Sequence, residues 1–253
     1  MHAVATRSEF LSLLRESVAD ARPRHAAALA FGVDAMDGRL AEGGLDGAAL
    51  HEFAPAASSL SDDAAATLFV AGVAARFAAA ADTRVLWVVS RFDLYAPGLE
   101  QAGLPPGRVI FAEAREDKDV LALVEDGLRH GGLAAVIGEV KRADMTATRR
   151  LQLAADAGRT PALLSRRWRR QGVCPLTELS AATTRWRVAC APSERLPAPG
   201  VGRGRWDVEL VRQRNGAPFS LLVEACDDKG RLAPPAGARD RATPAVGATA
   251  IAA

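Results

Sequence analysis

The sequence is poor in lysine, and one long stretch of it contains no glycine. Only three of its 32 basic residues are lysine, at positions 118, 141 and 229, and no glycine lies between Gly47 and Gly72. A phosphate-binding loop needs glycines that let backbone N–H groups reach phosphate oxygens, followed by a lysine that contacts the terminal phosphates. A loop of that kind is therefore excluded from this stretch.

Cysteine and histidine are also scarce, with three and four residues. An odd number of cysteines cannot all pair, and the wide separation of these three offers no paired spacing for zinc or a redox site. We therefore expect a reduced, cytoplasmic chain with no metal and no cofactor. His51, beside the first expected strand, is interpreted as a packed residue and not as a catalytic base. The three cysteines are Cys174, Cys190 and Cys226, and the other histidines are His2, His25 and His130.

Long apolar runs are missing too. The longest candidate, residues 64–81, is interrupted by Arg76 and consists mostly of alanine, so we expect no membrane span. Charged residues such as Arg7 and Glu9 argue against a signal peptide at the N-terminus. The net charge of +2 is too small to indicate a nucleic-acid-binding protein.

Residues 1–24 are expected to form a separate N-terminal element. Phe10, Leu14 and Val18 recur at the spacing of one helical face, which predicts an amphipathic helix over residues 8–21, ended by Pro23. Two interpretations stay open. The helix packs on its own domain, or it is an arm that docks on another subunit or partner.

The middle of the chain alternates apolar strands with helices, which is typical of a parallel sheet covered on both faces. In the first helix Ser61 is the expected N-cap, and Asp62 and Asp63 in its first turn would repel a phosphate. The expected strands are residues 48–53, 84–90, 108–112, 133–137 and 161–165, and the expected helices are 61–81, 97–102, 117–130 and 145–157.

The last third of the chain changes to a period of two. Trp186 and Val188 alternate with arginines, Trp206 and Val208 alternate with acids, and Asn215 with the glycine after it predicts a hairpin turn. Antiparallel strands therefore follow the parallel ones. Residues 229–253 are rich in Ala, Pro and Gly, and we expect a disordered tail there.

This plan resembles the RecA recombinase family over residues 30–228. The likeness is carried by residues 31–37, the glycine turn at 43–45, the degenerate loop before the first helix, and the hairpin at 209–219. Within that superfamily the sequence is most similar to the ImuA group, which lacks the nucleotide loop and has a strand like residues 184–188. The resemblance implies an α/β fold. Its three-layer RecA-like core has a mostly parallel sheet, extended by antiparallel strands at the C-terminal end.

The resemblance also shows which catalytic parts are missing. Phe92 occupies the position where RecA-like ATPases place a catalytic glutamate. Glu139 stands where a magnesium-binding acid is expected, beyond the strand at 133–137, and we expect a structural or loop-capping role for it. Phosphoryl transfer depends on positioning and electrostatic stabilisation, so the resemblance implies a protein that is not an enzyme.

One basic cluster stands out as a candidate surface. Four arginines and a tryptophan follow the strand at 161–165, close to where RecA-like proteins extend their DNA-binding loops. Such residues contact phosphates and stack on bases, they anchor protein interfaces, or they form a solvated loop with the tryptophan tucked inward. All three interpretations stay open. The candidate contact residues are Arg166, Arg167, Trp168, Arg169 and Arg170, with Phe10, Leu14 and Val18 of the N-terminal helix.

The ImuA resemblance implies a function. It is that of a non-catalytic accessory subunit of damage-induced, error-prone translesion DNA synthesis, within the SOS response. The implied partners are ImuB and an error-prone C-family DNA polymerase, with RecA or a second copy of the chain as further candidates. Two alternatives are a SulA-like division inhibitor that binds FtsZ and a RecA paralogue with residual ATP binding.

Overall fold

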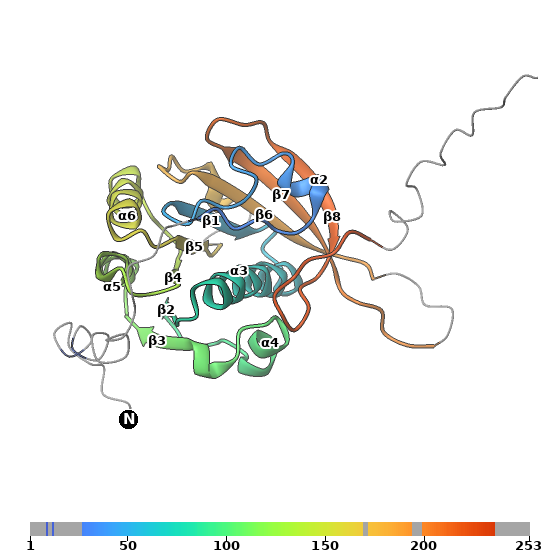
Figure 1. The fold of residues 1–253 in the computed structure, drawn as a ribbon, viewed down its shortest axis with the longest axis horizontal. Coiled ribbons are helices and arrows are strands. Elements are labelled where there is room, and N and C mark those ends of the chain that lie inside the picture. The colour runs from blue at the N-terminus through green and yellow to red at the C-terminus, as the bar shows by residue number, and fades with distance from the viewer. Residues whose placement is uncertain (1–8, 10–11, 13–26, 169–171, 194–198, 236–253) are drawn as a thin grey trace, which may run out of the picture.

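The computed structural model describes residues 9, 12, 27–168, 172–193 and 199–235. In this part of the chain eight strands form one sheet in the order β3-β2-β4-β5-β1-β6-β7-β8 (Figure 1). All pairings from β3 through to β6 are parallel, and β6-β7 and β7-β8 are antiparallel. The predicted α/β fold, mostly parallel with an antiparallel C-terminal extension, is confirmed. The strands are β1 (Leu50–Pro55), β2 (Val85–Val89), β3 (Val109–Glu113), β4 (Ala135–Val140), β5 (Ala162–Arg166), β6 (Thr184–Ala191), β7 (Arg205–Gln213) and β8 (Phe219–Glu224).

Helices cover both faces of the sheet and give three layers (Figure 1). The long helix α3 packs on one face together with α4, and α5 and α6 pack on the other. The helices are α2 (Asp34–Asp37), α3 (Leu60–Ala81), α4 (Ala96–Gln101), α5 (Asp117–His130) and α6 (Met145–Gly158), with 3-10 turns at Pro106–Arg108 and Pro175–Thr177.

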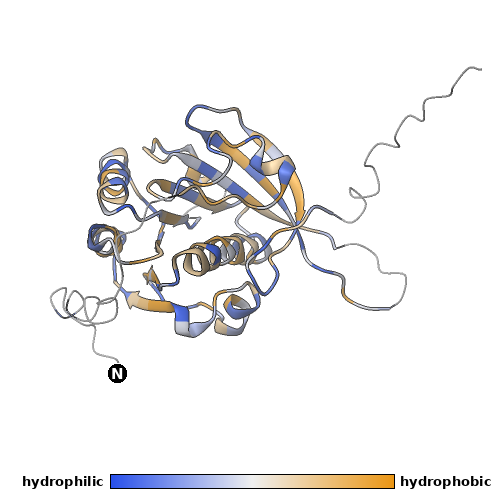
Figure 2. Cartoon of the chain, in the orientation of Figure 1, coloured by the Kyte–Doolittle hydropathy of each residue, from blue (hydrophilic) through white to orange (hydrophobic). Residues whose placement is uncertain are grey.

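The core on the α3 side is aromatic. Phe69 of α3 lies with its ring centroid 6.2 Å from that of Trp186 and 5.9 Å from that of Trp206. Both tryptophans come from strands with a period of two, whose alternation appears as blue and orange bands along β6 and β7 in Figure 2. Burying large aromatic side chains is a main source of stability, so the C-terminal strands belong to the same core as the parallel strands.

Helix α3 is long and apolar enough to cross a membrane by length and composition, with a mean hydropathy of 1.7 in its most apolar window. Yet 61% of that window is buried inside the protein. Phe69, Val70 and Ala74 of the helix are fully buried in the core. Its composition is therefore that of a helix that packs on a sheet.

Three expectations need correction. Ser59, not Ser61, caps α3, because the Ser59 hydroxyl oxygen accepts the backbone N–H of Asp62 at 3.2 Å. Strand β4 continues to Val140 and so includes Glu139. The carboxylate of Glu139 can lie within the sheet because it accepts the indole N–H of Trp87. The expected start of the disordered tail, residue 229, is too early, because residues 229–235 pack on the fold.

That packing is specific. Leu232 and Ala233 are buried, and Ala233 pairs with Glu224 at the end of β8. Gly230 lies so close to Gly72 of α3 that a Cβ on Gly230 would stand 2.5 Å from the Gly72 carbonyl oxygen. Residues 236–253 of the expected tail lie outside the described residues, as does most of the expected N-terminal element.

Candidate functional site at the carboxyl edge of the sheet

The carboxyl ends of the parallel strands meet the N-terminus of α3 at one edge of the sheet, which we call the carboxyl edge. Ligands of open α/β sheets bind outside the carboxyl ends of the strands, and anions bind at helix N-termini. This edge is therefore the place where a nucleotide would be expected.

The loop between β1 and α3 is hydrogen-bonded to an acid of the helix that follows it. Asp62 in the first turn of α3 is 9% exposed. One of its carboxylate oxygens accepts the backbone N–H of Ala57 at 3.0 Å, and the other accepts that of Cys190 in β6 at 2.9 Å. Backbone N–H groups of such a loop are the donors that a phosphate needs. Here the carboxylate of Asp62 already takes one of them, the N–H of Ala57.

Beside this loop, one arginine joins three carboxylates. Arg167, directly after β5, donates to Asp63 at 2.6 Å, to Asp93 at 3.2 Å, and to Glu139 from Nη2 at 2.6 Å and from Nε at 3.0 Å. The other oxygen of Glu139 accepts the indole N–H of Trp87 at 2.7 Å. We call Arg167, Asp63, Asp93 and Glu139 the Arg167 cluster. It connects α3, the loop after β2, β4 and the segment after β5.

The pKa values of the cluster follow from burial and from the arginines beside the acids. Burial raises the pKa of Glu139, against the charge and hydrogen bonds of Arg167, which lower it. Burial would also raise the pKa of Asp93, but the hydrogen bond from Arg91 and the charge of Arg167 bring that pKa below its usual range. Burial alone would lower the pKa of Arg167, yet the charge of Glu139 and its hydrogen bond raise that pKa. Each carboxylate of the cluster is thus hydrogen-bonded within the protein, although the acids outnumber Arg167.

A second ionic group lies on the opposite face of the sheet. Glu52 in β1 is fully buried and accepts from Arg166 at 2.8 Å and from Arg185 at 2.6 Å. Arg166 also donates to Glu178, at 2.5 Å. No spacing in the sequence points to this group, because its members come from β1, β5, β6 and the segment after β5.

These contacts change the interpretation of the basic cluster at 166–170. Arg166 was expected on the surface, but it is the last residue of β5 and is fully buried. Arg167 has a side chain that is 20% exposed and is used in the Arg167 cluster. Trp168 is half-buried and donates to the carbonyl of Pro55 at 2.9 Å. Arg169 and Arg170 lie outside the described residues, as do Phe10, Leu14 and Val18.

The geometry can be compared with known proteins. No protein-family model matches the chain. The protein ImuA of Caulobacter vibrioides strain NA1000 / CB15N is 39% identical to it over 202 residues, which are 78% of this chain and 83% of that protein. The protein ImuA of strain ATCC 19089 / CIP 103742 / CB 15 gives the same values. This chain belongs to the ImuA family. A solved structure, SulA from Pseudomonas aeruginosa, is similar with a TM-score of 0.40 and 24% identity, covering 47% of this chain and 97% of that one.

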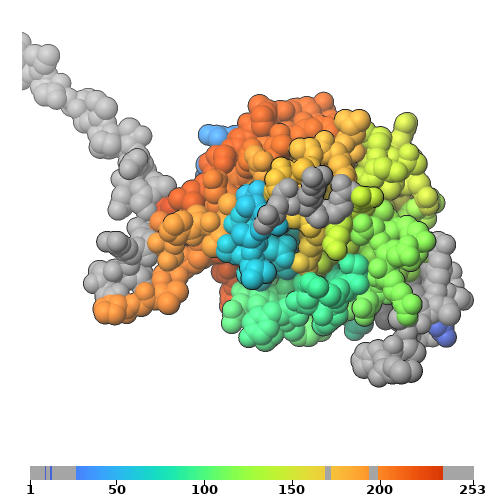
Figure 3. Space-filling model, turned by 180° about the vertical axis from the view of Figure 1, so that it is seen from behind, coloured from blue at the N-terminus to red at the C-terminus, as the bar shows by residue number. Residues whose placement is uncertain are grey.

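This ImuA-family chain also exposes apolar side chains at the carboxyl edge. Leu60 at the start of α3 is 91% exposed, Phe92 is 55% exposed and Tyr95 is 73% exposed. Phe92 packs edge-on against Phe111 with ring centroids 5.1 Å apart, so it is held in place while it faces solvent. Seen from behind, the segment that contains Leu60 lies between the segments around residues 95 and 175 (Figure 3). We call Leu60, Phe92 and Tyr95 the edge patch.

The described part of this ImuA-family chain contains no group of three or more His, Cys, Asp or Glu side chains that could hold a metal ion. Glu139, the one acid that the sequence pattern offered for magnesium, is 4% exposed and has both oxygens occupied by Trp87 and Arg167. Its arrangement fits the structural role expected for it.

Proposed function

We propose that this ImuA-family chain is a non-catalytic accessory subunit of damage-induced, error-prone DNA synthesis across lesions. It acts in the cytoplasm by contact with other proteins. ImuB and an error-prone C-family polymerase are its proposed partners, and RecA or a second copy of the chain are further candidates. The observation that carries the proposal is that Asp62 and the Arg167 cluster occupy the carboxyl edge.

A nucleotide would meet three obstacles at this edge. Its phosphates would have to displace Asp62 from two backbone N–H groups. They would also lie beside Asp63, Asp93 and Glu139, which already outnumber their shared cation Arg167. Lysine is absent from the loop. Electrostatic stabilisation of a transferring phosphoryl group needs positive charge, and these acids oppose it.

The edge patch supports action by contact. Aromatic side chains that are fixed by packing are frequent anchors of protein interfaces, and Phe92 on Phe111 is such a side chain. Exposed apolar side chains at one edge of a domain favour an interaction surface there. We therefore assign partner binding first to Leu60, Phe92 and Tyr95.

The function is tested by UV-induced mutation in a strain that lacks the gene, complemented with defined variants. We expect near-complete loss of induced mutants without the gene, full recovery with the wild type, and poor recovery with Phe92→Ser combined with Tyr95→Ser. Leu222→Ser, which changes an exposed leucine of β8, is the matched control and should restore the frequency. An unaltered frequency in the deletion strain would remove the proposed role. Full recovery with the double variant would exclude the edge patch as the partner-binding surface and would leave the proposed role in place.

The non-catalytic part of the proposal has its own test. Titration of the purified chain with ATP and magnesium, followed by calorimetry, should give no saturable binding up to millimolar concentration. Saturable binding at micromolar ATP would overturn this part and favour a RecA paralogue with residual nucleotide binding.

A further inference from the structure

In the described part of the chain, strand β8 forms an edge of the sheet, and one pair of hydrogen bonds fixes the direction of its backbone groups. It pairs with β7 on one side and stands last in the strand order (Figure 1). Glu224 bonds away from β7, since its N–H donates to the carbonyl of Ala233 at 2.8 Å and its carbonyl accepts the N–H of Ala233 at 3.5 Å. Bond directions alternate along an antiparallel strand. The N–H and C=O groups of Leu222 and Ser220 therefore also point away from the sheet.

These outward groups are unpaired among the described residues. No backbone group there bonds to Leu222 or Ser220 on this side. Both residues are exposed to solvent, Leu222 by 44%. Natural proteins protect such edges with charged side chains, prolines or bulges, and residues 220–223 contain none of these. Two N–H and two C=O groups are thus open to another strand.

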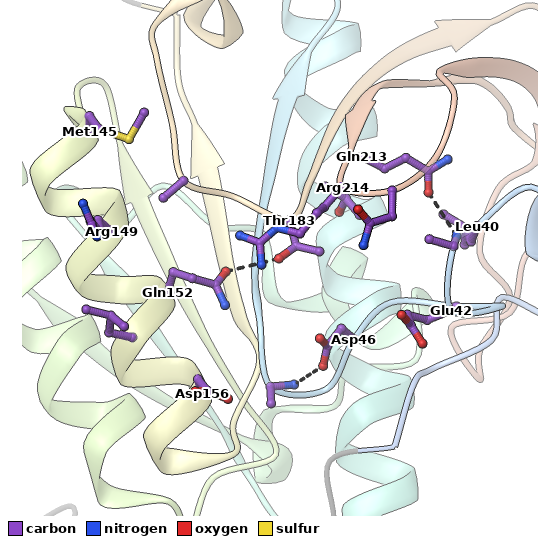
Figure 4. Close-up of a pocket in the computed structure, with 17 residues that line it drawn as sticks. Leu40, Glu42, Asp46, Met145, Arg149, Gln152, Asp156, Thr183, Gln213 and Arg214 are labelled. Carbon is purple, nitrogen blue, oxygen red and sulfur yellow. Dashed lines mark hydrogen bonds between the residues drawn. The ribbon is translucent and has the colours of Figure 1, made fainter.

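Both ends of this edge are held in place. At its start, Gln213 of β7 connects the hairpin turn to the loop after α2, on a wall of the cleft drawn in Figure 4. Its Nε2 donates to the carbonyl of Ala217 at 2.7 Å, and its Oε1 accepts the N–H of Ala41 at 3.1 Å. At the other end, Arg203 donates to the carbonyl of Arg231 at 3.0 Å. A preformed edge loses little conformational freedom on binding, which favours pairing with a further strand.

The chain itself pairs with this edge at one residue and then stops. The segment after β8 turns back and runs antiparallel to it, which places Ala233 opposite Glu224. Continued pairing would place Pro235 opposite Leu222, but proline has no N–H to donate. The pairing therefore ends at Ala233, and the edge beyond it stays open.

A second copy of β8 fits the edge poorly. Symmetric antiparallel pairing needs outward-facing residues on both copies. If Leu222 faces Ser220 of the other copy, Pro218 of that copy falls opposite Glu224, where Ala233 already lies. If Ser220 faces its own counterpart, Pro218 falls opposite Leu222 and offers no N–H. If Leu222 faces its counterpart, Ser220 meets Glu224, whose groups are bonded to Ala233. Each of these registers is obstructed, so the occupant is a different protein.

We propose that the outer edge of β8 at residues 220–222, which we call the β8 edge, binds an extended segment of a partner protein. The segment pairs through its backbone with the N–H and C=O groups of Ser220 and Leu222, a mode in which main-chain hydrogen bonds supply the affinity. It carries no proline where it faces these two residues, and it turns away before it reaches Ala233. The β8 edge is separate from the edge patch, whose residues belong to α3 and to the loop after β2.

Binding by the full chain tests the proposal. Since the proposal rests on the proposed function, in which the chain acts by contact, ImuB and the C-family polymerase, each purified, are the probes. Leu222→Pro removes the outward N–H, which an edge strand tolerates because that N–H faces solvent. Leu222→Ser is the matched control, since it loses the same side chain and keeps the N–H. For a probe that binds the wild type, we expect the proline variant to bind at least about tenfold more weakly and the serine variant within about threefold.

Hydrogen exchange of the wild type gives a second readout that needs no variant. In the free chain the amides of Ser220 and Leu222 should exchange rapidly, whereas that of Val223, which faces β7, should exchange slowly. A saturating probe should slow exchange at Ser220 and Leu222 at least about tenfold, because both N–H groups become hydrogen-bonded.

Several results would overturn the proposal. Equal losses for the proline and serine variants would mean that the side chain binds and the backbone does not. Slow exchange at Leu222 without a probe would mean that the edge is already covered, by a second copy if the rate depends on protein concentration and by the chain itself if it does not. A probe that binds without either effect would exclude the β8 edge alone and leave the proposed function in place. If neither probe binds the wild type, the proposed partners are wrong as well, so the two failures are distinguishable.

Discussion

Arg167 donates two hydrogen bonds to one oxygen of Glu139, from Nη2 at 2.6 Å and from Nε at 3.0 Å. The same guanidinium reaches Asp63 in the first turn of α3 and Asp93 after β2. One cation thus connects the elements that would surround a nucleotide in an ATP-binding α/β protein. The consequence is a carboxyl edge that is stabilised from within, because each of the three carboxylates has a hydrogen-bond partner in the protein.

Replacing Arg167 with methionine should destabilise the protein strongly. The change keeps the length of the apolar stem but leaves Asp63, Asp93 and Glu139 without their shared cation. Removing one partner of a buried ion pair costs about 3–5 kcal/mol. We expect the lower end of that range, because Asp63 and Asp93 are 33% and 31% exposed and retain contact with water. Urea unfolding at pH 7 measures the difference.

Arg91→Met is the matched control for that variant. Arg91 also pairs with Asp93, but its side chain is 81% exposed, and exposed ion pairs contribute less than about 1 kcal/mol. If both variants lose the same small amount of stability, the Arg167 cluster does not hold the edge together.

Glu139→Gln should be tolerated at neutral pH, although it removes a charge that Arg167 contacts. Burial raises the pKa of Glu139, which means that the folded state favours the protonated form more than the unfolded state does. The stability from this group is therefore present below the ordinary pKa of 4.5 and is lost as pH rises through the raised value. Glutamine resembles the protonated acid at every pH, and Arg167 keeps two other carboxylates.

Unfolding free energies of wild type and Glu139→Gln, compared between pH 4.5 and pH 8, test this sign. The wild type should lose stability relative to the variant as pH rises. If the wild type instead gains stability relative to the variant over this interval, the charge of Arg167 outweighs the effect of burial and lowers the pKa of Glu139.

The sequence predicted the fold well because the fold depends on local patterns. Continuous apolar runs placed the parallel strands to within a few residues, and the alternation around Trp186 and Trp206 predicted the antiparallel ones. Helix α5 occupies the predicted residues. Its acid Glu125 is 8% exposed and pairs with Arg129 and Arg150, because α6 packs beside α5.

The site could not be predicted from such patterns. The run of arginines at 166–170 was interpreted as one surface, yet strand alternation sends Arg166 inward to Glu52 and the next residue to the carboxyl edge. Glu52 has partners on two other strands. Contacts of this kind follow from strand order, which no spacing in the sequence encodes.

Asp62→Ala should loosen the loop between β1 and α3. The change leaves the N–H groups of Ala57 and Cys190 without their acceptor. Because both residues are exposed, water replaces part of each lost bond, and we expect a cost of about 0.5–1.5 kcal/mol for each bond. Hydrogen exchange should become several-fold faster at these two amides, since each 1.4 kcal/mol corresponds to a factor of ten. Ser61→Ala at an exposed position of the same turn is the control. Unchanged exchange at Cys190 would contradict the role given to the carboxylate.

We expect the free energy of unfolding to fall in mild acid because of His51. The residue is fully buried, and its Nε2 donates to the carbonyl of Asp46 at 2.8 Å. Its Nδ1 therefore accepts from the hydroxyl of Thr184 at 2.7 Å, and that hydroxyl oxygen accepts the indole N–H of Trp186. Burial lowers the pKa of His51 below 6.5, because the charged ring would lose its hydration.

The sign of the pH effect follows from that shift. A lowered folded-state pKa means that the unfolded chain binds the proton first as pH falls, so stability is complete above pH 6.5 and is lost below it. Each pH unit between the two pKa values changes the free energy of unfolding by about 1.4 kcal/mol. The test is urea unfolding of wild type and His51→Gln from pH 8 to pH 5, in which the contribution of Glu139 cancels because both proteins contain it. The wild type should lose its advantage over the variant below pH 6.5, whereas parallel curves would mean that His51 charges as easily in the folded protein as in water.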